Sequence, residues 1–298
     1  MKKYKNQVEE NEQFRLARND NERYAGLRQD EWRGGALIAE IADGSIAHEL
    51  GIETGARLIQ IDNLPARDAI QLKMADVAEK VTLTVVHPGG QVEHFDIEKD
   101  AFEPLGIGVD AELFDGVKRC TNKCPFCFVD QLPPRAKGAA TASGPYGGLP
   151  SSVERKNLRR TLYVRDDDFR LSFLHGHYIT LTNLKEDDFA RIIREKLSPL
   201  YVSVHATDPA TRARMVGNAR GGEIMERLRF LIDHGIQINA QIVLCPGLND
   251  GEQLDRSISD LMSLWPGVES VAVVPVGLTK FMPAERNLRT VRPDEAER

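Results

Sequence analysis

The sequence predicts an α/β protein in which a small, strand-rich domain precedes a partial (β/α) barrel. Its 298 residues suffice for two domains of ~100–200 residues each. After residue 101, strand and helix signals alternate, which is typical of a parallel sheet built from βα units. A cysteine-rich loop directly follows the first of these strands, and the active sites of (β/α) barrels lie at the carboxyl ends of strands.

The composition is that of an ordinary globular protein, with 41% hydrophobic and 28% charged residues. A formal net charge of −6 at pH 7 gives no electrostatic reason to expect a nucleic-acid partner. No apolar run is long enough to span a membrane, and the N-terminal segment lacks the apolar stretch of a signal peptide. Four cysteines, three of them clustered, suit a reducing compartment better than a disulfide framework. We therefore expect a cytoplasmic protein.

The first part of the chain contains an extension followed by a compact domain. Residues 1–33 are charged and polar, and we expect a disordered or weakly structured extension. Residues 34–100 are predicted to form a separate domain. Its predicted strands are residues 36–41, 57–61, 81–86 and 92–97, and its predicted helices are residues 46–50 and 73–80.

Several segments of this domain resemble the core of PDZ domains: GSIA at 44–47, TGARLI at 54–59 and IDN at 61–63. The resemblance implies a PDZ-like domain that adds a partner peptide as an extra strand, with the loop at 34–37 receiving the peptide carboxylate. This loop lacks the full Gly-Leu-Gly-Phe run of that family. The alternative, that the domain packs against the second domain or covers its active site, stays open.

Residues 101–280 are predicted to form the partial barrel. Residues 133–158 are rich in Gly, Ala, Ser and Pro, and we interpret them as a flexible insertion rather than a lid. Residues 281–298 are expected to be a polar tail, and the small number of strands suggests a truncated chain. The predicted strands are 179–181, 200–205, 237–244 and 271–274, and the predicted helices are 186–196, 224–234 and 254–264, with a further helix capped by Asp208 and opened by Pro209.

A run of three aspartates, Asp166, Asp167 and Asp168, lies between apolar segments. Such a run is compatible with a hard-metal site, but we interpret it as a solvated turn. Arg170 is expected to pair with a carboxylate, either that of Asp168 or that of a ligand.

The cysteine loop carries the chemistry that the sequence indicates. Cys120, Cys124 and Cys127 have the spacing C-x-x-x-C-x-x-C. Clustered thiolates select zinc, copper(I) or iron–sulfur clusters. A [4Fe–4S] cluster normally has four thiolate ligands, so three thiolates leave one iron open. A zinc site completed by His175 or His177, and unpaired thiols in a core, are the alternatives.

This spacing, with Phe126 just before the third cysteine, resembles the signature of the radical S-adenosylmethionine enzymes. The resemblance implies that Cys120, Cys124 and Cys127 bind a [4Fe–4S] cluster. The open iron then binds S-adenosylmethionine, and the reduced cluster cleaves it to a 5′-deoxyadenosyl radical. It also implies cofactor contacts beside the motif and at the strand ends, for which the candidates are Phe126, Thr182, Asn183, Ser203 and Gln241.

Taken over residues 34–280, the chain resembles the PDZ-containing radical S-adenosylmethionine proteins. The segments that carry the resemblance include RCTNKCPFCFVDQLP, LYVRDDDFRLSFL, LSPLYVSVHATDP and QIVLCPGLNDG. Members typically carry a further C-terminal domain, which we do not find here. The resemblance implies S-adenosylmethionine, an unknown substrate and an external electron donor as partners, with a peptide or protein partner for the PDZ-like domain. It assigns no reaction.

Two other functions stay open. The chain is either an enzyme or an iron–sulfur redox-sensing or PDZ-type peptide-binding protein without catalysis. Cys245 ends the strand predicted at 237–244 and is most simply interpreted as a small buried residue, with a reactive thiol or an auxiliary ligand as alternatives.

Overall fold

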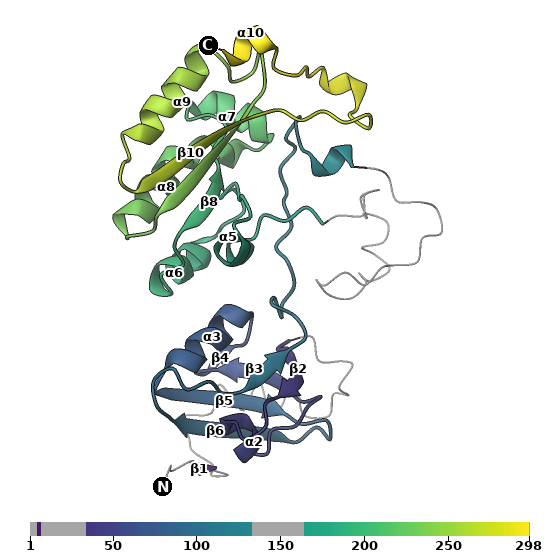
Figure 1. The fold of residues 1–298 in the computed structure, drawn as a ribbon, viewed down its shortest axis with the longest axis vertical. Coiled ribbons are helices and arrows are strands. Elements are labelled where there is room, and N and C mark those ends of the chain that lie inside the picture. Colours follow the sequence, from purple (N-terminus) through teal and green to yellow (C-terminus); the bar gives the residue numbers. More distant parts are fainter. Residues whose placement is uncertain (1–4, 7–33, 133–163, 298) are drawn as a thin grey trace. The chain divides into compact units, whose positions relative to one another are not determined.

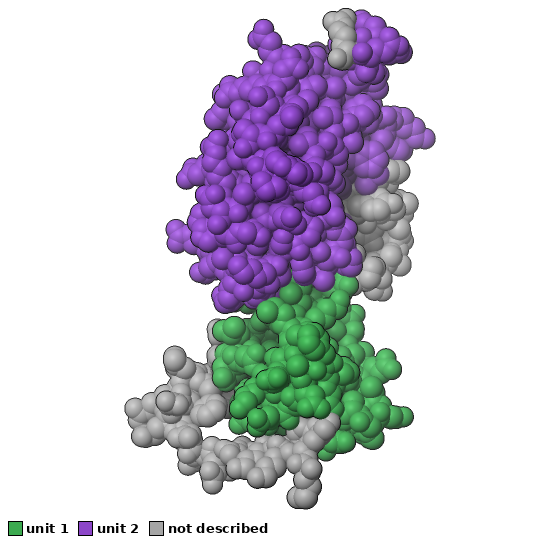
Figure 2. Space-filling view, turned by 60° about the vertical axis from the view of Figure 1, so that its left-hand side comes forward, with its two compact units in different colours: residues 1–117, 141–150 green, residues 118–140, 151–298 purple. Residues whose placement is uncertain are grey.

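The computed structural model describes residues 5–6, 34–132 and 164–297, which form two compact units (Figures 1 and 2). Unit 1 ends at Val117 and unit 2 begins at Lys118. The predicted insertion at 133–158 lies outside the described residues, as does the predicted extension at 1–33 apart from Lys5–Asn6. No helix in the described ranges is both long and apolar enough to cross a membrane.

Unit 1 is an antiparallel sheet with two short helices. Its strand order is β1-β6-β5-β3-β2-β7, and β4 pairs with β3. Inward-facing residues such as Leu58, Leu83 and Phe95 form its core. The strands are β1 (Lys5–Asn6), β2 (Ala36–Ile41), β3 (Arg57–Ile61), β4 (Leu64–Pro65), β5 (Lys80–Val86), β6 (Val92–Glu98) and β7 (Ile107–Val109), and the helices are α2 (Ile46–Glu49) and α3 (Ala69–Val77).

The four strands predicted for unit 1 have bounds within one residue of the observed ones, whereas helix α3 and the end of the unit differ. Strands β2 and β3 match the prediction. Helix α3 begins four residues earlier than predicted, because the Asp68 side chain accepts a hydrogen bond from Gln71 N and caps it. Residues 101–117 belong to unit 1, beyond the predicted boundary at 100, because β7 pairs with β2 and Leu105 is buried in the core.

Unit 2 is built on three parallel strands in the order β10-β9-β8 (Figure 1). Helices alternate with the strands along the chain, as the sequence predicts. The elements are β8 (Leu200–Ser203), β9 (Ile238–Leu244), β10 (Val268–Pro275), α5 (Phe169–His175), α6 (Glu186–Arg194), α7 (Pro209–Val216), α8 (Ile224–Asp233), α9 (Glu252–Met262), α10 (Pro293–Ala296) and the 3₁₀ turns η3 (Val129–Gln131), η4 (Ala219–Glu223) and η5 (Ala284–Arg286).

The strand predicted at 179–181 is reduced to one bridge. Ile179 pairs in parallel with Val202, and Leu181 then adopts a left-handed backbone with φ 61°. Among the described residues, the parallel sheet therefore comprises three strands and this bridge, and a barrel stays a prediction. The segment predicted as a polar tail contains η5 and α10.

A buried arginine joins the ends of these strands. Arg212, on α7, is 0% exposed, and its guanidinium donates to the carbonyl oxygens of Thr180, Ser203, Val204 and Gly221 at 2.6–2.9 Å. Burial lowers its pKa to about 9, which leaves the group charged at neutral pH. Buried carbonyl groups need hydrogen-bond donors. The Arg212 side chain supplies these donors to carbonyl groups from several elements.

Replacing this side chain tests its role. Arg212→Met keeps most of the side-chain volume but leaves buried carbonyls without donors, each at a cost of ~1–3 kcal/mol. We expect the free energy of unfolding to fall by about 3 kcal/mol or more, measured by urea denaturation. Arg214→Met, on the less buried face of the same helix, is the control and should change stability little. Equal effects of the two substitutions would contradict this assignment.

Candidate active site at the cysteine loop

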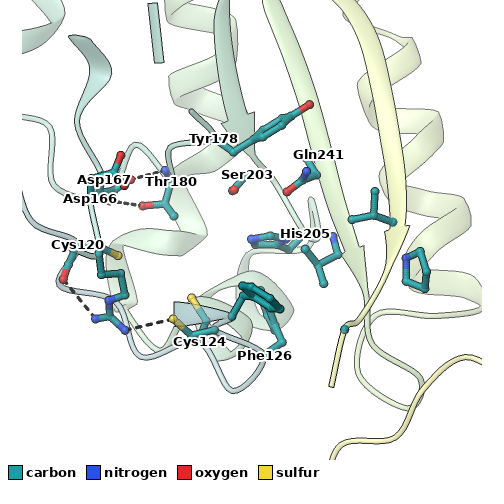
Figure 3. Close-up of a pocket in the computed structure, with 17 residues that line it drawn as sticks. Cys120, Cys124, Phe126, Asp166, Asp167, Tyr178, Thr180, Ser203, His205 and Gln241 are labelled. Atoms are coloured by element: carbon teal, nitrogen blue, oxygen red, sulfur yellow. Dashed lines mark hydrogen bonds between the residues drawn. The ribbon is translucent and has the colours of Figure 1, made fainter. Parts of the chain in front are cut away.

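A cavity of about 380 Å³ lies where the strands of unit 2 end (Figure 3). Ser203 is the last residue of β8, Gln241 and Val243 lie on β9, and Pro275 ends β10. Clefts at the carboxyl ends of parallel strands are the usual ligand sites of α/β proteins. The cavity is lined by Cys120, Cys124, Phe126, Cys127, Phe128, Arg165, Asp166, Asp167, Tyr178, Thr180, Ser203, His205, Gln241, Val243, Val274, Pro275 and Gly277.

All three clustered cysteines line this cavity as free thiols. Cys124 is 9% exposed, and burial raises the pKa of its thiol to about 12. Among the described residues, no three His, Cys, Asp or Glu side chains are gathered closely enough to hold one metal ion. Clustered thiols are donors that zinc, copper(I) and iron–sulfur clusters all accept, so the chemistry of this donor set is compatible with a cluster.

The loop that carries the cysteines packs on the end of α7. Lys123 N donates to Val216 O at 2.8 Å, and Cys120 N donates to Arg165 O at 2.9 Å. Gly217 ends α7 with φ +60°, and a Cβ at this position would lie 2.8 Å from Lys123 O. Glycine is therefore required here both for its backbone conformation and for the close approach of the loop.

Four polar side chains form a buried network beside the cysteines. Asn122 donates to Thr180 Oγ1 at 2.7 Å and accepts from Thr182 Oγ1 at 2.9 Å. Asp167 accepts from both the backbone N and the Oγ1 of Thr180, each at 2.6 Å. Burial raises the pKa of Asp167 above its usual range. This network fixes the position of the loop relative to the start of the sheet.

Two predicted cofactor contacts, Thr182 and Asn183, lie in or beside this network and not at the cavity. Thr182 is buried within it and does not line the cavity, whereas Thr180 does. Asn183 donates from Nδ2 to Asp167 O, and it too lies outside the cavity lining. The cavity thus brings together the other predicted residues: the three cysteines, Phe126, Ser203 and Gln241.

His205 lines the cavity as a neutral imidazole with its proton on Nε2. Its Nδ1 accepts a hydrogen bond from Val243 N at 3.2 Å, so the neutral ring carries its proton on Nε2. Burial lowers its pKa to about 3, which keeps the ring neutral at pH 7. The ring lies edge-on to Phe126 at 4.7 Å between centroids and points into the cavity (Figure 3). It therefore presents an N–H donor to whatever occupies the cavity.

The other possible metal ligands that the sequence suggested, two histidines and the fourth cysteine, lie outside the cavity lining. His177 pairs with Asp166 at 3.0 Å, and neither His175 nor His177 lines the cavity, so the structure does not bring them to the cysteines. Cys245 is 0% exposed and lies in the apolar cluster beneath the cavity, as expected of a small buried residue.

The interpretation of the aspartate run as a solvated turn is wrong. Asp167 and Asp168 are almost completely buried. Asp168 caps α5 and pairs with Arg170 at 2.8 Å, which confirms the predicted pairing, and Asp167 joins the network beside the cysteines. Tyr178, Thr180 and Arg165 also line the cavity, although sequence reasoning did not select them. The apolar segments that flank the aspartates were the available signal for burial.

The fold and the cavity define an α/β protein with a thiol-lined cavity at the ends of its parallel strands. The chain belongs to the Radical SAM-like domain family, whose model matches residues 99–142 and 152–271. No curated protein matches the chain. A solved structure described as a radical SAM methyltransferase from Sphaerobacter thermophilus is 14% identical over 92% of this chain and 80% of that chain, with a TM-score of 0.34. That similarity is too low to support an argument about this chain.

The contact between Gly217 and the cysteine loop predicts a specific defect. Gly217→Ala combines a left-handed backbone strain of ~1–2 kcal/mol with a clash against Lys123 O. We expect lower thermal stability and a lower iron content after reconstitution. Gly235→Ala is the matched control, because Gly235 has φ +82° but no atom within 4 Å of the place that a Cβ would occupy. It should lose stability and keep its iron; equal iron contents in the two variants would contradict the role of Gly217.

Proposed function

We propose that the protein is a radical S-adenosylmethionine enzyme of unassigned reaction, in which Cys120, Cys124 and Cys127 hold a [4Fe–4S] cluster. One observation carries the proposal: the three free thiols of a C-x-x-x-C-x-x-C loop line a strand-end cavity in a chain that belongs to the Radical SAM-like domain family. The cofactors are the cluster and S-adenosylmethionine. The other partners are an external electron donor and an unidentified substrate.

A cluster held by Cys120, Cys124 and Cys127 would supply the electron for reductive cleavage of the C–S bond of S-adenosylmethionine, which would give methionine and a 5′-deoxyadenosyl radical. The protein positions the reactants and excludes water. Cys124 and Phe126 form a nearly buried floor, and Val243 and Val274 add apolar walls. Such a lining limits solvent access to a reactive intermediate.

Polar groups at the strand ends orient the bound ligand in this proposal. No hydrogen bond to another described residue engages the side chains of Ser203 and Gln241, which both line the cavity. His205 adds an Nε2–H donor. Thr182 and Asn183 remain candidates from the family resemblance, and their place in and beside the buried network supports an indirect, positioning role.

We also infer that unit 2 is a partial (β/α) barrel and unit 1 a PDZ-like domain. The parallel strands with alternating helices support the first inference, and the order of strands and helices in unit 1 supports the second. We do not extend the second inference to peptide binding. Strand β2 pairs with β3 on one edge and with β7 on the other. Both edges are therefore occupied, and a peptide cannot add to β2 as an extra strand.

The direct test is cleavage of S-adenosylmethionine. After anaerobic reconstitution with iron and sulfide, dithionite and S-adenosylmethionine should yield 5′-deoxyadenosine with the wild type and none with Cys124→Ala. Cys245→Ala, which removes a buried thiol outside the cavity lining, should retain the activity. A wild-type protein that holds a cluster but forms no nucleoside would contradict the proposal and favour a redox-sensing protein.

The donor role of His205 makes a second prediction. His205→Phe keeps a ring but removes the N–H, and loss of one hydrogen bond of ~1–1.5 kcal/mol corresponds to roughly tenfold weaker binding. We expect this loss of affinity for S-adenosylmethionine in equilibrium dialysis. His205→Gln, which keeps an N–H donor, should restore part of the affinity. Unchanged affinity in His205→Phe would show that the donor is not used for this ligand.

A further inference from the structure

One arginine touches both the backbone and a thiol of the cysteine loop. Arg165 Nη1 lies 3.6 Å from Cys127 Sγ and 3.4 Å from Asp130 Oδ2. Its Nη2 donates to Cys120 O at 3.2 Å and to Asn122 O at 2.5 Å. The side chain is 8% exposed. The guanidinium is therefore fixed by several partners and shielded from solvent directly beside a proposed cluster ligand.

A second arginine reaches the same loop in a different way. Arg286 donates to Pro125 O at 3.0 Å and pairs with Asp130 at 3.0 Å. Asp130 thus lies between the two guanidinium groups. Among the described contacts, Arg286 reaches loop carbonyls and no thiol. It therefore serves as a comparison for Arg165, because it places the same charge against the same loop and the same carboxylate but makes no contact with a sulfur.

Charge near a cluster changes the stability of its two redox states. Reduction adds one negative charge to a group that is already bound by three thiolates. A cation close to a ligand sulfur stabilises the reduced state more than the oxidised state, and hydrogen bonds to sulfur act in the same direction. Low solvent exposure weakens the screening of this effect.

We propose that Arg165 is a positioning and redox-tuning residue that raises the reduction potential of the cluster on Cys120, Cys124 and Cys127. This proposal rests on the proposed function. Through its donors to Cys120 O and Asn122 O, Arg165 also sets the path of the loop. Asp130 holds the guanidinium in place, and its negative charge offsets part of the increase in potential.

The test is a potentiometric titration of the reconstituted protein without S-adenosylmethionine, monitored by EPR. Arg165→Met should lower the potential, with about a tenfold decrease in the ratio of reduced to oxidised cluster at a fixed potential, or about 59 mV for one electron. Arg286→Met should give a clearly smaller decrease. Asp130→Asn removes a negative charge while the carbonyl contacts still hold Arg165, so it should raise the potential.

Each outcome decides the proposal. Equal shifts for Arg165→Met and Arg286→Met, or a rise for Arg165→Met, would overturn it. If Arg165→Met does not retain a cluster, Asp130→Asn decides, and an unchanged or lower potential would overturn the proposal. A wild-type protein without a cluster would end both this proposal and the proposed function. A cluster whose potential follows Arg165, in a protein that forms no 5′-deoxyadenosine, would leave the tuning role standing and reject only the enzyme.

Discussion

The buried guanidinium of Arg212 is the interaction on which the site depends most. It satisfies the carbonyl groups of Thr180, which follows the bridge at Ile179, and of Ser203, which ends β8, and both residues line the cavity. Because Arg212 lies on α7, the same contact holds this helix against the strand ends. The last turn of α7 then supplies Val216 O and Gly217, on which the cysteine loop rests. Helix α7 thereby positions both the cysteine loop and the cavity-lining residues Thr180 and Ser203.

The site combines rigid apolar and polar parts with local backbone strain. Leu181 and His205 both adopt left-handed backbone conformations, the first just after the bridge at Ile179 and the second just after the end of β8. Such conformations cost free energy in residues other than glycine and occur often at functional sites, where the surrounding contacts hold them. For His205 these contacts are Asn249, which donates to its carbonyl at 2.7 Å, and Val243 N, which donates to its ring. The result is a neutral ring with its N–H directed into the cavity.

Local sequence patterns predicted most of the helices and strands. Contacts between residues distant in sequence decide which side chains reach the cavity. Short apolar segments bounded by turn residues located β2, β3 and β9, and the cysteine spacing located one wall of the site. Thr182 was selected because it follows a predicted strand. The structure reduces this strand to the bridge at Ile179, Leu181 has a left-handed backbone, and the Thr182 hydroxyl donates to Asn122 instead of lining the cavity. The contact of Arg286 with Pro125 joins residues 161 positions apart, and no local pattern indicates such a pair.

The central claim is that the three cysteines hold one cluster with an iron open to S-adenosylmethionine. EPR spectra of the reduced, reconstituted protein with and without S-adenosylmethionine test it most directly. Ligation of the open iron should change the spectrum, and Cys120→Ala, Cys124→Ala and Cys127→Ala should each abolish the signal. A spectrum that S-adenosylmethionine leaves unchanged, or a protein that takes up only a single zinc ion, would contradict the account.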